Sequence, residues 1–290
     1  MKGPTVIDAK KMLSCIQQDF PFSIDEILRV DEITEYSNIN YVFRFRVRSQ
    51  TRKIIFYLKL AHPYLSRALR PPYDFAKVRY PQERIGIEAT VLQALEKLWG
   101  KEIVPSVYAV DIPHGVMALS DVGEKGKLLI TEFEQNRVHP EIATTIARLM
   151  GIMHSSTYGT TREWCTLKSW RKESTAYIQK RIAGSVVPFV GKGALQQFVR
   201  EAASAPQSLT WTDPIFRNIF VKSRGKVSCI DFDIARTFDP AYDIGLITAH
   251  WKWMELKGIL KVRQDAQKFL KNFFTVYLRT LATYGVPAKD

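Results

Sequence analysis

The sequence predicts an α+β chain in two parts, a strand-rich part over residues 1–119 and a largely helical part over residues 120–290. Alternating apolar and charged residues from Tyr41 to Arg48 indicate a half-exposed strand, and a more apolar strand follows at Ile54–Leu60. Later in the chain, apolar residues recur at steps of three and four, which is the spacing of amphipathic helices. We place the boundary between the parts at the polar break around residues 119–123.

The composition is that of a folded protein with a sizeable core. Of the 290 residues, 46% are apolar and 12% aromatic, which excludes wholesale disorder. No stretch approaches the roughly 18 apolar residues of a membrane span, and the N-terminal segment lacks the apolar core of a secretory signal. The three scattered cysteines form neither a disulfide framework nor a zinc spacing, so we expect a reducing, cytoplasmic location.

The chain is basic, with 42 Lys and Arg residues against 29 Asp and Glu residues and a net charge of +13. Such a charge is compatible with nucleic acid, an acidic membrane surface or a phosphorylated metabolite as partner. The main basic cluster alternates with apolar residues, which favours the solvent face of a strand over an RNA-binding stripe; it comprises Arg44, Arg46, Arg48, Arg52 and Lys53. A nucleic acid is therefore not the expected partner.

The predicted strands carry the first candidate binding residues. A short helix is expected over residues 5–20, and the polar loop Ser37-Asn38-Ile39-Asn40 precedes the first strand. Such a loop can approach phosphates with its backbone N–H groups, although it contains no glycine. In the second strand Lys59 stands alone among apolar residues. A buried lysine needs a partner, so Lys59 is either a phosphate-binding residue or an exposed edge lysine.

A helix and two more strands follow. Apolar residues at Ile87, Val91, Leu95 and Leu98 predict a helix beginning after Pro81. Glu88 lies beside this stripe and is a candidate ion-pair partner for Lys59, with an ordinary solvated glutamate as the alternative. Strands are expected at residues 104–110 and 115–119, and an adenine ring would dock after them against main-chain groups of Leu119, Ser120, Asp121 and Val122.

The second part of the sequence is mostly helical. We expect helices over residues 142–153, 172–182, 192–203, 244–253 and 264–284. His154, at the end of the first stripe, is interpreted as a structural residue with satisfied hydrogen bonds. Trp251 either lines a substrate pocket or fills the core.

The stretch from Leu209 to Gly245 carries the chemistry. Asp213 is followed five residues later by Asn218, and two short apolar runs around a Gly-containing turn predict a hairpin that ends at the acid pair Asp231 and Asp233. Phosphoryl transfer requires such a set, with one carboxylate for the attacking hydroxyl and an amide and a carboxylate for magnesium. A single aspartate at such a place is usually a cap or turn residue, but the ordered set favours a catalytic site.

With these residues in place, the chain resembles the aminoglycoside phosphotransferase and choline kinase superfamily, which has a protein-kinase-like bilobal fold. Within it, the chain is most similar to the methylthioribose kinases. The resemblance is scattered over about residues 30–250 and rests on the segments SNINYVFRF, LKLAHPYL, RIGIEATVLQAL, VMALSDVG and FDPAYDIGLITAH.

The resemblance implies a role for each matching residue. Asp213 would be the catalytic base, and Asn218, Asp231 and Asp233 would hold Mg²⁺. Lys59 would bind the α- and β-phosphates of ATP, and Glu88 would orient Lys59. Arg236, which has no clear match in the family pattern, is a further candidate for contact with an oxygen of the substrate or of a phosphate.

The chain departs from the family in two places. The family usually reads His-Gly-Asp where this chain has Trp211-Thr212-Asp213, and the nucleotide loop lacks its usual glycines. Because the histidine is regarded as supporting rather than chemical, its loss is expected to affect loop geometry more than mechanism.

The expected function is an ATP- and Mg²⁺-dependent kinase acting on a hydroxyl of a small molecule, with methylthioribose as the favoured acceptor. A kinase of another alcohol (an aminoglycoside, choline, homoserine or another sugar) is the first alternative. A catalytically inactive nucleotide-binding protein is the second, and a basic RNA-binding module is a distant third.

Overall fold

The computed structural model describes residues 4–33, 40–61, 81–124, 126–137, 140–159, 207–259 and 263–286, with single residues and pairs between 191 and 201. The chain divides into two compact units. Unit 1 comprises residues 1–93, 105–121 and 165–199, and unit 2 comprises residues 94–104, 122–164 and 200–290. The predicted helix over 172–182 and the loop residues Ser37 and Asn38 lie outside the described residues.

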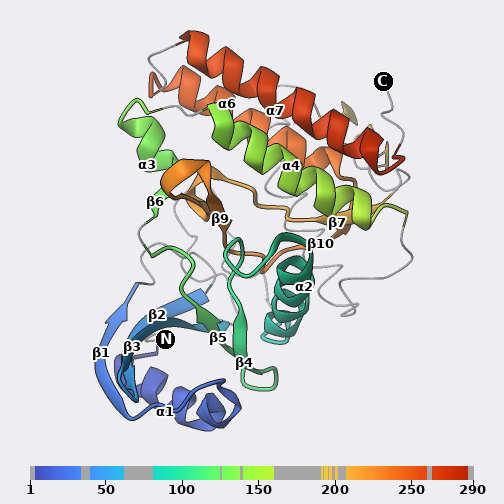
Figure 1. Ribbon diagram of the computed structural model, residues 1–290. Coiled ribbons are helices and arrows are strands. Elements are labelled where there is room, and N and C mark those ends of the chain that lie inside the picture. Colours follow the sequence, from blue (N-terminus) through green and yellow to red (C-terminus); the bar gives the residue numbers. More distant parts are fainter. Residues whose placement is uncertain are drawn as a thin grey trace. The chain divides into compact units, whose positions relative to one another are not determined.

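Unit 1 is built on a five-stranded antiparallel sheet (Figure 1), and four of its strands were predicted from the sequence. Its strands lie in the order β1-β2-β3-β5-β4, and their bounds are Glu26–Glu32, Asn40–Ser49, Arg52–Ala61, Val116–Ser120 and Val107–Asp111 respectively. The edge strand β1 was not predicted, because a bulge between Ile27 and Arg29 interrupts its alternation. Strand β4 begins three residues later than predicted, after Pro105, which has no N–H to offer a ladder.

The two faces of this sheet have different roles. Phe43, Phe45 and Val47 of β2 are fully buried and join the core formed with helix α1 (Val6–Ile16). Because side chains alternate along a strand, residues 42, 44 and 46 project from the other face. The register places Val42 opposite Lys59 and Arg44 opposite Tyr57. Lys59 therefore lies on the face away from α1, where helix α2 (Arg84–Trp99) supplies its partner.

Unit 2 is mainly helical, again as predicted. Its helices are α3 (Leu129–Glu134), α4 (Pro140–Ser156), α6 (Ala241–Leu256) and α7 (Arg263–Thr283). Two small sheets accompany them, one pairing β7 (Ser208–Thr210) with β10 (Arg236–Phe238), the other ordered β6 (Lys127–Leu128), β8 (Ile219–Val221) and β9 (Val227–Cys229). Strands β8 and β9 form the predicted hairpin, and its turn places Arg224 and Gly225 at positive φ.

Aromatic side chains form much of the core of unit 2. Trp251 is 1% exposed and stacks on Phe269, with ring centroids 4.5 Å apart. Phe133 contacts both rings edge-on, and Phe216 packs against Phe133 and Trp251. Trp251 thus fills the core in this structure. None of the described helices is long and apolar enough to cross a membrane.

Helices α4 and α7 pack along each other (Figure 1), and their contact depends on a glycine. A Cβ added at Gly151 of α4 would lie 2.8 Å from the Cβ and Cγ2 of Thr280 on α7. That distance is far inside van der Waals contact, so any larger residue must push the helices apart.

We predict that Gly151→Ala lowers the free energy of unfolding by about 1–3 kcal/mol through overpacking. The matched control is Gly245→Ala in α6, where an added Cβ meets nothing within 4 Å. There the higher helix propensity of alanine should raise the stability by about 0.5–1 kcal/mol. Urea unfolding of both variants measures the two effects, and equal signs would contradict the packing account.

Candidate active site

In unit 1 the predicted ion pair of Lys59 and Glu88 is confirmed. Lys59 Nζ lies 2.8 Å from both carboxylate oxygens of Glu88. The two side chains are 7% and 1% exposed, so the pair is almost entirely withdrawn from solvent. A buried charge pair of this kind costs desolvation energy on both sides, and it holds the ammonium group on β3 in one place.

The same helix makes a second buried contact that the sequence did not predict. Arg84 is fully buried, and its Nη2 donates to Oδ1 of Asn40 over 2.7 Å. Asn40, the last residue of the predicted phosphate loop, is the first residue of β2. Arg84 stands four residues before Glu88, so both side chains lie on one face of α2. Helix α2 therefore fixes the lysine and the end of the loop together, and the i, i+4 spacing is the signal that could have revealed this.

Beside Lys59 the sheet offers a surface for a flat ring. Tyr57 is two residues before Lys59 on the same face and pairs in register with Leu119 of β5. Burial and the charge of Asp121 raise the pKa of the Tyr57 hydroxyl, so the ring stays neutral. Two main-chain groups of the predicted adenine-binding segment are already bonded, since the N–H of Ser120 donates to Ser106 and the carbonyl of Val122 accepts from Ser228.

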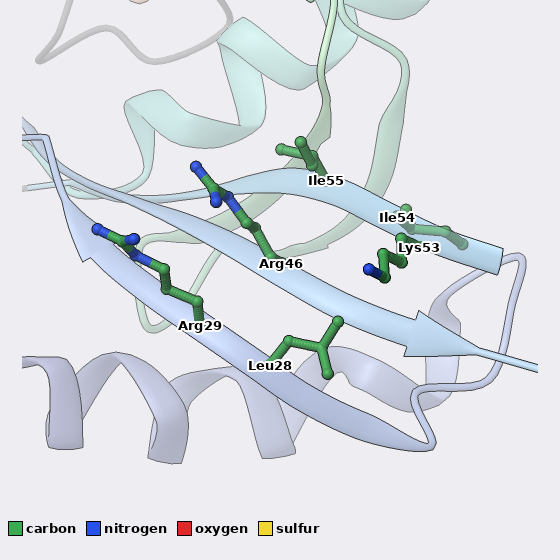
Figure 2. Close-up of a pocket in the computed structure, with 6 residues that line it drawn as sticks. All are labelled: Leu28, Arg29, Arg46, Lys53, Ile54 and Ile55. Carbon is green, nitrogen blue, oxygen red and sulfur yellow. The ribbon is translucent and has the colours of Figure 1, made fainter.

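A basic pocket of about 330 Å³ opens farther along this sheet (Figure 2). Its lining combines three cations with three aliphatic residues and comprises Leu28, Arg29, Arg46, Lys53, Ile54 and Ile55. None of the predicted site residues lines it. The predicted basic cluster is thus not a uniformly solvated face, and Arg44 is partly buried in an ion pair with Asp31.

In unit 2 the segment carrying Asp213 is held in an unusual backbone conformation. Thr212, immediately before Asp213, has a φ of 65°, and its hydroxyl donates to the carbonyl of Ile234 over 2.6 Å. Non-glycine residues rarely adopt such a φ, and those that do are found preferentially at functional sites. The amide nitrogen of Asn218 lies 3.0 Å from the carbonyl and 3.3 Å from Oδ2 of Asp213. The predicted base and one predicted metal ligand are therefore neighbours.

Asp231 lies beside Asn218 because the hairpin brings its ends together. The N–H of Ile230 donates to the carbonyl of Asn218 over 2.9 Å, and Asp231 follows directly. Asp231 also has a positive φ, 66°. Its backbone carbonyl accepts a hydrogen bond of 2.9 Å from the indole Nε1 of Trp211. Cys229, just before it, is buried, and burial raises the pKa of its thiol, which excludes a nucleophilic role.

Asn218 and Asp231 suit Mg²⁺, which takes part of its coordination from phosphates and waters, better than a metal ion bound by protein side chains alone. No three His, Cys, Asp or Glu side chains gather into a metal site within the part of the chain that the structure describes. Mg²⁺ is typically bound by one or two carboxylates, with phosphates and waters completing its octahedron. Because the nitrogen of the Asn218 amide faces Asp213, its oxygen is the atom left for a cation. Asp231 adds a half-exposed carboxylate, whereas Asp233 is only 3% exposed.

A fully buried carboxylate organises this region, and sequence reasoning missed it. Asp243 of α6 accepts hydrogen bonds of 2.7 Å from the backbone N–H groups of both Trp211 and Thr212. Its Oδ2 also lies 3.1 Å from Nε2 of His154. The other ring nitrogen lies 2.9 Å from the hydroxyl of Tyr277, whose pKa is raised by burial and by the charge of Asp243. The prediction of a structural His154 is confirmed. The repeated aspartates of the segment DPAYD were the available signal.

Comparisons with known proteins agree with this fold. Residues 41–266 match the Phosphotransferase enzyme family. Choline kinase LicA from Streptococcus pneumoniae superposes with a TM-score of 0.54 at 15% identity, over 96% of this chain and 88% of that one. The ternary complex of streptomycin, ATP and APH(2")-IIa gives 0.51 at 10% identity, over 98% and 87% of the two chains. Amicoumacin kinase hAmiN in complex with AMP-PNP, Ca²⁺ and Ami gives 0.54 at 12%, over 96% and 78%. No curated protein is significantly similar in sequence.

We predict that Asp243→Asn destabilises the protein by roughly 2–5 kcal/mol, because the new amide turns a donor toward a backbone N–H that also donates. The control is Asp239→Asn in the same segment. The Asp239 carboxylate accepts a solvent-exposed hydrogen bond from the N–H of Ala241, so its loss should cost less than about 1 kcal/mol. Denaturant unfolding measures the stability of both variants. A similar loss of unfolding free energy in both would show that Asp243 does not organise this region.

Proposed function

Because the chain belongs to the Phosphotransferase enzyme family, we propose that it is an ATP-dependent kinase that transfers the γ-phosphoryl group to a hydroxyl of a small molecule. The observation that carries this proposal is the arrangement around Asn218. Its amide contacts Asp213, and its backbone is bonded to the strand end that carries Asp231. A base and a pair of oxygen ligands for a cation are the parts that phosphoryl transfer requires.

Asp213 acts on the acceptor in this proposal. Its carboxylate accepts a hydrogen bond from the acceptor hydroxyl and takes up the proton as the oxygen–phosphorus bond forms and the bond to the ADP oxygen breaks. The contact with the Asn218 amide holds this carboxylate in place, at 3.3 Å from Oδ2. The positive φ of Thr212 sets the direction in which the segment leaves β7. Positioning the hydroxyl is the main contribution of these residues.

Asn218 and Asp231 are the residues that would hold Mg²⁺, which would neutralise the charge that develops on the phosphates. Both ligands are rigidly placed. The amide of Asn218 is oriented by Asp213, and the backbone of Asp231 is fixed by Trp211. Asp233 is two residues further along and buried, so we assign it a supporting role behind Asp231.

Unit 1 supplies the nucleotide contacts in this proposal. Lys59 neutralises charge on the α- and β-phosphates, and Glu88 keeps its ammonium group directed. Tyr57 presents a neutral ring on the same face, suited to stacking on a base. Asn40, the last residue of the predicted phosphate loop, is anchored by Arg84.

The acceptor is proposed more coarsely than the reaction. The similar structures named above are a choline kinase, a complex with streptomycin and an amicoumacin kinase. These three small molecules differ widely in size and charge. The sequence resemblance favours methylthioribose, a sugar. Arg236, a candidate for contact with the acceptor or a phosphate, is 4% exposed, and its guanidinium lies 4.5 Å above the ring of Phe238 in the same strand. Trp251 fills the core of unit 2, so we assign it no contact with the acceptor.

We predict that Asp213→Asn lowers kcat by about 10²–10⁴-fold, the usual contribution of a positioned base, while the dissociation constant of an ATP analogue changes less than about threefold. The asparagine keeps the shape and the contact with Asn218 but cannot take up a proton. Single-turnover kinetics with each active acceptor and calorimetric titration with AMP-PNP measure the two quantities. Near-normal turnover would show that Asp213 is not the base.

A screen of acceptors tests the substrate class. We expect ATP consumption above background with methylthioribose and little with choline, homoserine or aminoglycosides. Coupled ADP detection measures this, with Asp213→Asn as the blank for each acceptor. Preference for another alcohol would replace methylthioribose and leave the kinase assignment intact. Tight binding of Mg²⁺ and ATP without turnover on any acceptor would indicate a catalytically inactive nucleotide-binding protein.

A further inference from the structure

Trp211 stands where the resembling families usually have histidine, and its contacts are unusual for a core tryptophan. The side chain is 1% exposed and stacks on Phe232, with ring centroids 4.6 Å apart and planes 14° from parallel. Its backbone N–H donates to Asp243, and its indole N–H donates to the carbonyl of Asp231. Trp211 belongs to the segment that carries Asp213, and its indole contacts the segment that carries Asp231, so one residue joins the two segments.

The indole bond acts at a strained point of the chain. Asp231 has a φ of 66°, a conformation that non-glycine residues rarely keep unless their surroundings hold it. The hydrogen bond of 2.9 Å fixes the carbonyl of Asp231. Because the carbonyl and the side chain share the same Cα, fixing one in a defined φ also fixes the direction of the other.

Resting on the function proposed above, we propose that Trp211 is a positioning residue that couples the base segment to the metal-binding segment. It does so through its N–H group and not merely through its bulk. In a histidine, Nε2 occupies the place in the five-membered ring that Nε1 has in indole, so both residues can present a donor to the Asp231 carbonyl. Tryptophan adds the stacking surface on Phe232, and its N–H is always a donor.

Two substitutions of Trp211 remove its N–H group and its stacking surface separately. Trp211→Phe keeps a ring to stack on Phe232 and removes the N–H. Trp211→His keeps a ring nitrogen in the donor position and removes most of the stacking area. The control is Trp251→Phe, because Trp251 is equally buried and stacks on Phe269 at 4.5 Å and 12°. Within the described part of the chain its ring packs on Phe133, Phe216 and Phe269.

The experiment measures three quantities on the full chain: thermal stability, Mn²⁺ affinity in the presence of AMP-PNP by electron paramagnetic resonance, and hydrogen exchange of the peptide spanning residues 230–235. We expect Trp211→Phe to weaken Mn²⁺ binding at least tenfold and to speed exchange at least tenfold. Trp211→His should stay within about threefold of the wild type in both, although it is the less stable variant. Trp251→Phe should lose stability only.

The proposal is overturned if the least stable of the three variants also shows the weakest Mn²⁺ binding and the fastest exchange. Trp211 would then be a packing residue. Unchanged exchange in Trp211→Phe would also overturn the proposal. If the wild type binds no Mn²⁺ with AMP-PNP, the proposed function fails instead. The coupling of the two segments is then decided by hydrogen exchange alone, which needs no ligand.

Discussion

The buried carboxylate of Asp243 is the constraint on which the rest of unit 2 depends. It accepts two backbone hydrogen bonds from the segment before Asp213 and contacts His154 on α4. A buried charge is tolerated only when its hydrogen bonds are supplied. The carboxylate therefore demands that α4, α6 and this segment come together in one arrangement. Thr212 can occupy its strained conformation because both its N–H and its hydroxyl are bonded.

From that point the order of the site follows step by step. Trp211 donates its backbone N–H to Asp243 and its indole N–H to the carbonyl of Asp231. The hairpin brings the residue before Asp231 into hydrogen-bonding contact with Asn218. In unit 1, α2 plays the corresponding part by holding Lys59 through Glu88 and the start of β2 through Arg84. In both units, side chains that carry the predicted chemistry are fixed by buried polar contacts.

Much of this could be predicted from the sequence, where a periodic pattern or a chemical need marks the residue. The alternation of β2, the apolar stripe of α2 and the isolated Lys59 in a hydrophobic strand predicted a sheet, a helix and a buried ion pair. Strand β1 escaped because its bulge breaks the alternation, and the three-residue strands β7 and β10 are too short to show a period. Asp243 and Arg84 escaped for another reason. Their partners lie 32 and 44 residues distant in sequence, so the local signals (the i, i+4 spacing of α2 and the repeated aspartates of DPAYD) mark the residues without identifying what they bind.

In the proposed function, Lys59 binds the phosphates of a nucleotide, and Asn218 and Asp231 bind the Mg²⁺ of the same nucleotide. A crystal structure with AMP-PNP and Mg²⁺ tests it most directly. The account predicts Lys59 Nζ within hydrogen-bonding distance of an α- or β-phosphate oxygen, and one Mg²⁺ bound by Asn218 Oδ1 and an Asp231 carboxylate oxygen. A nucleotide that binds without touching these three side chains, or an ion held elsewhere, would contradict it.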